Sequence, residues 1–431
     1  AQNCHDAAQT AKLVAQLQEA NKAGGGIPLL VATDQEGGNV SRLDFGTTGV
    51  SNMAIAATGN PDNARAMASV YGEELALLGI NTDFAPVMDI NYNPANPVIG
   101  IRSFSDDPET VAQYGVKFIE GLRENGIIPT LKHFPGHGNT DTDSHTGFPS
   151  ISSTYKELKK CEMVSFKTAI DAGADMIMTA HIQYPQIEKE TYTSITSGEQ
   201  VFLPATMSKT IITDILRTDM GFEVVVITDA LDMAAVTQNF EFEDTLKMAM
   251  NAGVDLLMLP IITDTNIYKQ TCYAVEIAVR LVNEGEVDIK TVDDAVRRIL
   301  TLKKKYGLLK SGDYSLSNSA INNAADRIGS SKNRLLSIRI AKEALTCVKN
   351  ENNAFPLNVK AGEHTLILFA DSCASRVGTG TFAEQLLESD EALPAGYRNI
   401  AADENVKLIP EGADISVMVN NKENGDEYPI I

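Results

Sequence analysis

Short apolar runs alternate with amphipathic stretches over the first 260 residues of the chain. The runs are PLLVAT (28–33), INTDFAPV (80–87), IIPTLKHF (127–134), ADMIMTAH (174–181), VVVITD (224–229) and VDLLMLP (254–260). Amphipathic segments lie between them, such as 61–79 and 207–221, and the first opens with Pro61 and ends with Gly79, as helices prefer. Strands that alternate with helices predict an α/β fold with a parallel sheet, and near-continuous apolar strands fit a sheet that is buried on both faces.

The same pattern predicts a TIM-type (β/α)8 barrel that lacks its first strands in this chain. Residues 6–26 read as a helix ahead of the first apolar run, and closing an eight-stranded barrel requires two more strands than the runs provide. An open sheet of six strands is the alternative. A helix-rich stretch at 271–306 ends this domain, which we assign to residues 1–309.

A second, smaller domain is predicted after a polar segment. Residues 310–330 are rich in Ser and Asn and read as a linker. Beyond it, residues 331–431 contain helical patterns and two apolar runs, HTLILFA (364–370) and DISVMV (414–419). They predict an α/β sandwich domain that is partial in this chain.

Composition excludes several classes of partner. The net charge of −21 argues against nucleic acid and anionic membranes, and no apolar run approaches the roughly 20 residues that span a bilayer. The five cysteines are widely spaced without a C-x-x-C pair, which argues against a disulfide framework and a zinc knuckle. The oligomeric state cannot be read from the sequence.

Polar residues stand where the apolar runs end. They are Asp34, Lys132, His133, His181 and Asp229. In a parallel barrel these strand ends open on one face, where active sites lie. Four strands that deliver polar groups to one rim therefore predict a site. Neighbouring residues of a strand point to opposite faces, so we expect Lys132 and His133 to reach one ligand only if the strand has ended.

The stretch 132–145, KHFPGHGNTDTDSH, holds three of the six histidines, with Asp141 and Asp143 beside them. Its Pro and Gly residues predict a loop, and a loop dense in titratable groups is typical of a site. Asp143 stands two residues before His145, and a carboxylate beside an imidazole orients it for acid–base catalysis. The alternative is a solvated polar loop. His133 and His137 have a spacing that suggests a metal site only on a helix, which Pro135 makes unlikely.

Several of these residues have a structural alternative. Asp229 at the tip of a stiff Val/Ile run is either a rigidly held nucleophile or a helix N-cap. Asp34 is followed by Gly37 and Gly38, which allow either close approach of a ligand or a turn; Glu36 is a weaker candidate. Asp83 and Asp89 flank the segment FAPVMD and are predicted to be structural.

Five separated blocks together resemble glycoside hydrolase family 3, in its β-N-acetylglucosaminidase branch. They are DQEGGNVSRL (34–43), INTDFAPVMDINYNPANPVIGIRSFSDDP (80–108), LKHFPGHGNTDTDSHTGFP (131–149), DAGADMIMTAH (171–181) and VVVITDALDM (224–233). They occur in family order, and the region after the linker resembles the second domain of larger members.

The resemblance implies a role for each matching residue. Asp229 matches the catalytic nucleophile, His145 the residue that moves the proton, and Asp143 the carboxylate that orients it. Residues that match the sugar-gripping positions are Asp34, Arg102, Lys132 and His133. The family segment that forms the first strand, the first helix and the second strand has no counterpart here, in agreement with the strand count.

The implied reaction is retaining removal of terminal N-acetylglucosamine from peptidoglycan- or chitin-derived saccharides, with no cofactor or metal. Alternatives are a phosphorylase variant, a family 3 β-glucosidase, a metal-dependent hydrolase and a non-catalytic sugar-binding protein. Two-domain members of the branch favour a secreted or cell-envelope location, with the cytoplasm as the alternative.

Overall fold

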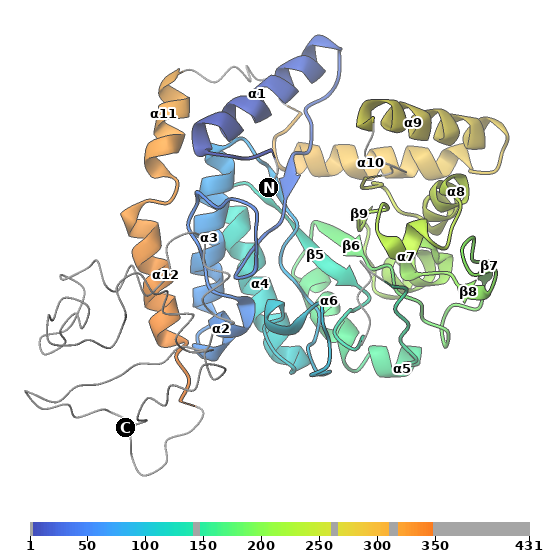
Figure 1. Cartoon of the computed structure of the whole chain (residues 1–431), viewed down its shortest axis with the longest axis horizontal. Helices are drawn as coiled ribbons and strands as arrows, with labels where there is room; N and C mark the ends of the chain where they lie inside the picture. The colour runs from blue at the N-terminus through green and yellow to red at the C-terminus, as the bar shows by residue number, and fades with distance from the viewer. Residues whose placement is uncertain (1–2, 141–146, 260–265, 310–317, 348–431) are drawn as a thin grey trace, which may run out of the picture. The chain divides into compact units, whose positions relative to one another are not determined.

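A five-stranded parallel sheet forms the centre of the chain (Figure 1). The computed structural model describes residues 3–140, 147–259, 266–309 and 318–347. The strands, in their spatial order, are β1 (Ala32–Thr33), β4 (Thr82–Asp83), β5 (Ile128–Phe134), β6 (Met176–Thr179) and β9 (Val225–Thr228). Leu256 extends the sheet by a parallel bridge to Ile227. All six apolar runs therefore reach the sheet, which confirms the predicted α/β fold.

Two antiparallel hairpins stand apart from this sheet. They are β2 (Gln35–Gly37) with β3 (Val40–Ser41), and β7 (Thr191–Thr193) with β8 (Gln200–Phe202). Gly37 and Gly38 have φ values of 86° and 56°, which favour glycine because it has no Cβ. Gly37 therefore ends β2 and Gly38 begins the turn of the first hairpin, close to Asp34.

Helices follow most strands, as predicted. The first half of the chain contains α1 (Ala7–Ala23), α2 (Asn52–Ala57), α3 (Asp62–Leu77), η1 (Gly100–Arg102), α4 (Pro108–Glu124), α5 (Tyr155–Leu158) and α6 (Glu162–Asp171). The second half contains η2 (Ala205–Met207), η3 (Thr210–Asp219), α7 (Ala234–Thr237), α8 (Phe242–Ala252), α9 (Ile267–Asn283), α10 (Ile289–Lys305), α11 (Asn318–Arg327) and α12 (Ser331–Glu343). The helices predicted at 61–79 and 207–221 correspond to α3 and η3, and the latter is wound as a π-helix.

Helix α4 illustrates how local sequence sets these elements. The Asp107 side chain accepts a hydrogen bond from Thr110 N, and Pro108 occupies the first turn, where its missing N–H costs nothing. Val111, Phe118 and Leu122 are buried and recur at helical spacing. This face packs against α3 and the hydrophobic core that α3 shares with α1, so α4 covers the sheet beside β5.

Both faces of the sheet are buried. Leu131, Ile177 and Val226 face the helices of one side, where they pack with residues of α6 and η3. Neighbouring strand residues such as Met176 and Val225 pack on the other side, with Leu302 of α10. The apolar runs are continuous because side chains on both faces need apolar neighbours.

The predicted linker is partly helical. Helix α11 contacts α1 and α3, and α12 contacts α2 and α3, so one compact unit extends from Ala1 to Leu345. The apolar runs 364–370 and 414–419 of the predicted second domain lie outside the described residues. The division into two domains stays a prediction.

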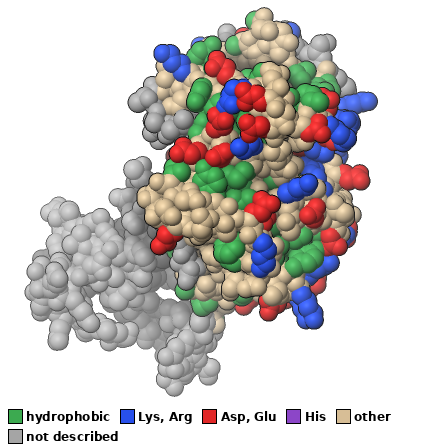
Figure 2. Space-filling view, turned by 90° about the vertical axis from the view of Figure 1, so that its right-hand side faces the viewer, with side chains coloured by type: hydrophobic (Ala, Val, Ile, Leu, Met, Phe, Trp, Pro, Cys, Tyr) green, Lys and Arg blue, Asp and Glu red, His purple; other side chains and the backbone are tan. Residues whose placement is uncertain are grey.

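Charge is mixed on the surface of the described unit. On the face in Figure 2, acidic and basic side chains alternate with separate hydrophobic patches. Within the described ranges, none of the helices combines the length and apolarity that a bilayer crossing requires.

Candidate functional site

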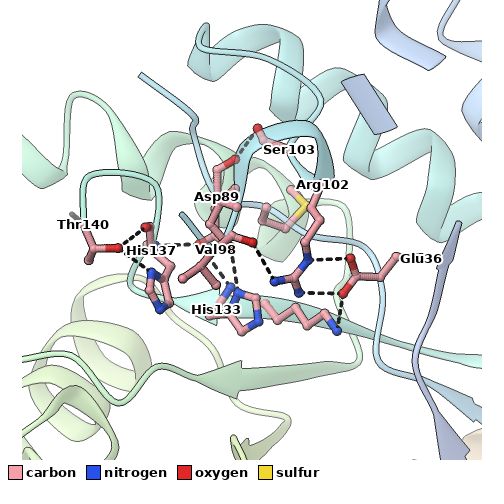
Figure 3. A network of polar contacts seen from close by, with 12 residues as sticks. Glu36, Asp89, Val98, Arg102, Ser103, His133, His137 and Thr140 are labelled. Carbon is pink, nitrogen blue, oxygen red and sulfur yellow. Dashed lines mark hydrogen bonds and ion pairs between the residues drawn. The ribbon is translucent and has the colours of Figure 1, made fainter. Parts of the chain in front are cut away.

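Lys132 lies at the centre of a buried network of charges, of which Figure 3 shows Glu36 and Arg102. Its Nζ atom is 2.6 Å from Asp34 Oδ1 and 2.6 Å from Glu36 Oε1. Arg102 meets Glu36 with two contacts, Nε to Oε2 at 2.9 Å and Nη2 to Oε1 at 2.7 Å. Three predicted sugar-gripping residues, Asp34, Lys132 and Arg102, are therefore brought together, and Glu36 links them.

The charges in this network stabilise one another. Burial alone would raise the pKa of Glu36, but Lys132 and Arg102 outweigh burial and lower that pKa. For Lys132, burial would lower the pKa, and Glu36 and Asp34 outweigh it and raise that pKa. The two carboxylates and two cations are therefore all charged at neutral pH. The Asp34 side chain is 31% exposed, whereas Glu36 is 1% exposed, so Asp34 is the carboxylate that a ligand can reach.

The next residue, His133, belongs to a second group, centred on Asp89. The His133 Nδ1 atom is 2.7 Å from Asp89 Oδ2, and His133 N donates to Asp89 Oδ1 at 3.2 Å. His137 N donates to the same Oδ1 atom at 2.7 Å. The two histidine rings pack edge to face with centroids 5.8 Å apart.

Lys132 and His133 join these groups although β5 continues through both residues to Phe134. In the structure the two side chains contact different carboxylates, and their access to one ligand stays a prediction. The register against β6 is irregular between Leu131 and Phe134, and the Lys132–His133 peptide bond is cis. An irregular register between paired strands interrupts the usual alternation of side chains.

Both histidines are neutral at neutral pH. Burial is the main cause that lowers the pKa of His133 well below its usual range, and Arg102 lowers it further. Burial also lowers the pKa of His137, although Asp89 opposes the shift. A neutral imidazole offers one donor and one acceptor, which suits recognition of hydroxyl groups.

Asp229 follows β9 directly, as predicted. Its Oδ1 atom accepts from Ala230 N at 2.7 Å, and its own N–H donates to Thr179 O at 3.2 Å. The N-cap alternative is wrong for the next helix, since α7 begins at Ala234 and has Met233 as its N-cap. The Asp229 carboxylate acts to raise the pKa of both His133 and His137, so it lies in the same site.

His181 supports the Asp229 segment from the neighbouring strand. Its Nε2 atom is 3.0 Å from Ala230 O, and its Nδ1 atom is 2.8 Å from Thr206 Oγ1. Thr206 Oγ1 in turn donates to Ala180 O. This buried chain of contacts fixes the backbone next to Asp229, a role that the sequence did not assign to His181.

The turn after β5 is held at several points. Tyr184 Oη donates to Gly136 O at 2.6 Å, and Asn96 Nδ2 donates to His137 O at 2.8 Å. A Cβ atom at Gly138 would lie 1.7 Å from Ile90 O, so the backbone of the turn rests directly on that segment. Asp143 and His145, the predicted acid–base pair, lie just beyond this turn and outside the described residues.

The sequence analysis gave two members of the site less weight than their contacts do. Asp89 was predicted to be structural, yet it contacts both His133 and His137. It stands two residues after Val87, which forms a parallel β-bridge with Lys132. Asp89 is therefore another polar residue that follows the end of a strand segment. Glu36 was ranked below Asp34, but it links Lys132 to Arg102. The sequence feature that could have indicated Glu36 is the segment Asp34-Gln35-Glu36 after a strand, because two carboxylates that are two residues apart can contact one cation.

A hollow of about 360 Å³ adjoins Arg102. Its walls come from the first hairpin and the segment before η1, and they comprise Asn39, Val40 and Pro97 to Arg102. Of the charged network, Arg102 is the member that lines the hollow.

Comparisons with known proteins find relatives in one family of enzymes. Residues 1–302 match the family model described as glycosyl hydrolase family 3 N terminal domain. The chain is 36% identical over 379 residues to beta-hexosaminidase A of Pseudoalteromonas piscicida. The aligned region covers 85% of this chain and 61% of that protein. A solved family 3 beta-N-acetylglucosaminidase from Paenibacillus sp. str. FPU-7 is similar with a TM-score of 0.70 and 35% identity, over 79% of this chain and 61% of that one.

A beta-glucoside phosphorylase, BglX, is also similar in structure. Its TM-score is 0.72 at 28% identity, over 82% of this chain and 61% of that one. The chain thus spans about three fifths of the length of each of these three proteins.

Proposed function

The chain belongs to glycoside hydrolase family 3, and we propose that the protein is a retaining exo-β-N-acetylglucosaminidase. Its sheet and helices correspond to the N-terminal, TIM-type domain of that family. The observation that carries the proposal is Asp229 at a strand tip, beside the network of Asp34, Lys132, His133 and Arg102. A rigid carboxylate next to groups that can bind hydroxyls is what a glycosyl-enzyme mechanism requires.

The proposed reaction proceeds in two displacements. Asp229 attacks the anomeric carbon and forms an ester bond, the bond from that carbon to the leaving oxygen breaks, and His145 gives that oxygen a proton. Water then attacks the same carbon and passes a proton to His145, and the ester to Asp229 breaks. Asp143 orients His145 throughout, as the family resemblance implies.

The binding network divides the work of recognition. The exposed Asp34 carboxylate can accept from one sugar hydroxyl, and the neutral His133 ring can bind another. Glu36 fixes Lys132 and Arg102 through ion pairs, and the remaining N–H groups of these two residues can donate to the sugar. Terminal N-acetylglucosamine of peptidoglycan or chitin fragments is the proposed substrate, since two similar proteins are a beta-hexosaminidase and a beta-N-acetylglucosaminidase.

Phosphorolysis is the second candidate, because a similar structure is a beta-glucoside phosphorylase. In that reaction inorganic phosphate replaces water in the second displacement. A histidine acid–base group would favour it, since a neutral imidazole does not repel an anion as a carboxylate does.

The experiment compares aryl β-N-acetylglucosaminide with aryl β-glucoside, each with and without inorganic phosphate and a chelator. We expect faster turnover of the N-acetylglucosaminide, with N-acetylglucosamine as product and no effect of chelator. A sugar phosphate product would establish the phosphorylase, and preference for the glucoside would indicate a β-glucosidase. Loss of activity with chelator, or no turnover of either substrate, would overturn the proposal.

A further inference from the structure

Asp89 is a buried carboxylate with several partners next to the sugar-gripping residues. It is fully buried, and it receives two backbone N–H groups at Oδ1 and the His133 ring at Oδ2. Ser103 Oγ donates to its backbone carbonyl at 2.6 Å. Asp89 thus connects β5, the turn after β5 and the segment next to Arg102 through its hydrogen bonds.

We propose that Asp89 is a positioning residue that holds His133 with its proton on Nδ1 and presents Nε2 as a hydrogen-bond acceptor to one sugar hydroxyl. The inference rests on the proposed function and deepens it. It states which way the hydrogen bond between His133 and the sugar runs, and which buried residue decides that direction.

The direction follows from the contacts of Asp89. Burial raises the pKa of Asp89, while the His137 ring and the two backbone N–H groups at Oδ1 act in the opposite direction and favour the ionised carboxylate, which can only accept. Burial makes the His133 ring neutral, since it lowers the pKa of that ring. The single ring proton therefore lies on Nδ1, toward Asp89 Oδ2, because the hydrogen bond of one ring nitrogen fixes the tautomer of the whole ring. Among the described residues, Nε2 has no hydrogen-bond partner, so it is available to a ligand.

The Asp89→Asn variant separates this role from a structural one. The Asn side chain carries one acceptor and one donor group, so it cannot accept on both sides. If its oxygen stays with the two backbone N–H groups, its NH₂ faces Nδ1 and moves the ring proton to Nε2. His133 then becomes a donor toward the sugar.

The test measures kcat/KM for an aryl β-N-acetylglucosaminide and for analogues in which one ring hydroxyl at a time is replaced by fluorine, which can accept a hydrogen bond but cannot donate one. For the wild-type enzyme we expect about a 10- to 100-fold penalty when fluorine replaces the hydroxyl that donates to His133 Nε2, because the hydroxyl can serve either tautomer but the fluorine only an Nε2–H donor. In D89N, activity on the parent substrate falls and this particular penalty shrinks to about twofold or less. The penalties for the other hydroxyls stay unchanged.

Two controls sharpen the result. H133A should abolish the same penalty, and D89N combined with H133A should be no worse than H133A alone, because both act through one ring. D175N changes another buried Asp, which contacts Arg123, Lys305 and Tyr306 at the opposite end of β6. It should lower Tm and leave every hydroxyl penalty as in wild type.

Three results would overturn the proposal. Equal loss by D89N on the parent and on all analogues would mean a purely structural role, and an unchanged penalty in H133A would mean that His133 is not the acceptor. If D89N does not fold, nitrogen NMR of the wild-type histidine side chains, assigned with H133A, decides; protonation of His133 on Nε2 at neutral pH would contradict the proposal. Absence of wild-type turnover on N-acetylglucosaminides would instead count against the proposed function, while the NMR result still tests the tautomer.

Discussion

Lys132 and Glu36 show how strongly single residues of this site depend on one another. Each is almost fully buried, and each retains its charge because oppositely charged groups lie within 3 Å. Replacing one member leaves a charge without its partner in a dry environment, which costs far more than the loss of an exposed ion pair. Activity and stability are therefore coupled at these positions.

Glu36→Gln should destabilise the protein in a pH-dependent way. Above pH 5 we expect a loss of about 3–5 kcal/mol in the free energy of unfolding, as for other broken buried ion pairs. Because the folded-state pKa of Glu36 lies below its ordinary value of 4.5, the wild-type contribution is present above that value and is lost as pH falls through the folded pKa. Denaturant unfolding of both proteins across acidic pH measures the difference.

The difference in the free energy of unfolding between the wild type and Glu36→Gln should therefore become smaller as the pH falls below 4.5. A constant difference at all pH values would contradict the ionised state of Glu36. Asp107→Asn is the control, since the Asp107 side chain caps α4 and is exposed; Asn caps helices about as well as Asp, so this variant should cost about 0.5 kcal/mol or less.

At the scale of elements, the sequence was informative where apolar periodicity was strong. It predicted α1, α3 and every strand of the parallel sheet. It predicted that Asp34, Lys132, His133 and Asp229 come together, because parallel strands end at one edge. It could not reveal the irregular register within β5 or the helix α11 within a polar segment, since both depend on neighbours that are distant in the sequence. The role of Asp89 was missed for the same reason: its partners lie 44 and 48 residues away.

The turn at Gly136–Gly138 should be intolerant of added side-chain atoms. In Gly138→Ala the new Cβ would overlap the carbonyl of Ile90, and because that group is backbone, the turn itself must move. We expect a loss of about 2 kcal/mol or more in stability, and a fall in kcat of at least tenfold if the acid–base residues beyond the turn move with it.

Gly24→Ala serves as the matched control. Gly24 ends α1, and a Cβ atom there meets only ordinary contacts at 3.5 Å and beyond. Thermal unfolding and turnover should match the wild type in that variant. Equal behaviour of the two alanine variants would show that the turn is not constrained by Ile90.

At the scale of the whole described unit, Glu74 attaches the last helices to the rest. This buried side chain of α3 accepts from Thr47 N at 2.8 Å, from Gly329 N at 2.9 Å and from Asn333 Nδ2 at 3.2 Å. Its partners therefore include the junction between α11 and α12, at the C-terminal end of the predicted linker. The compact unit extends to Leu345 partly because of this carboxylate.

Glu74→Ala should loosen α11 and α12. Buried donors that lose their acceptor cost about 1–3 kcal/mol each, so Tm should fall and limited proteolysis should cut near α11 sooner. The neighbouring Glu73 pairs with Arg327 at the surface, and Glu73→Ala should cost about 1 kcal/mol or less. Indistinguishable proteolysis of the two variants would contradict the attachment by Glu74.

The most direct measurement is to trap the glycosyl-enzyme and locate the modified residue. A fluorinated N-acetylglucosaminyl substrate with a good leaving group slows the second displacement, so intact-mass and peptide analysis reads the attachment site. The account predicts one sugar added per chain, on the peptide that contains Asp229, and none in Asp229→Asn. A label on another residue, or steady turnover with no trapped sugar, would contradict the assignment of Asp229 as the nucleophile.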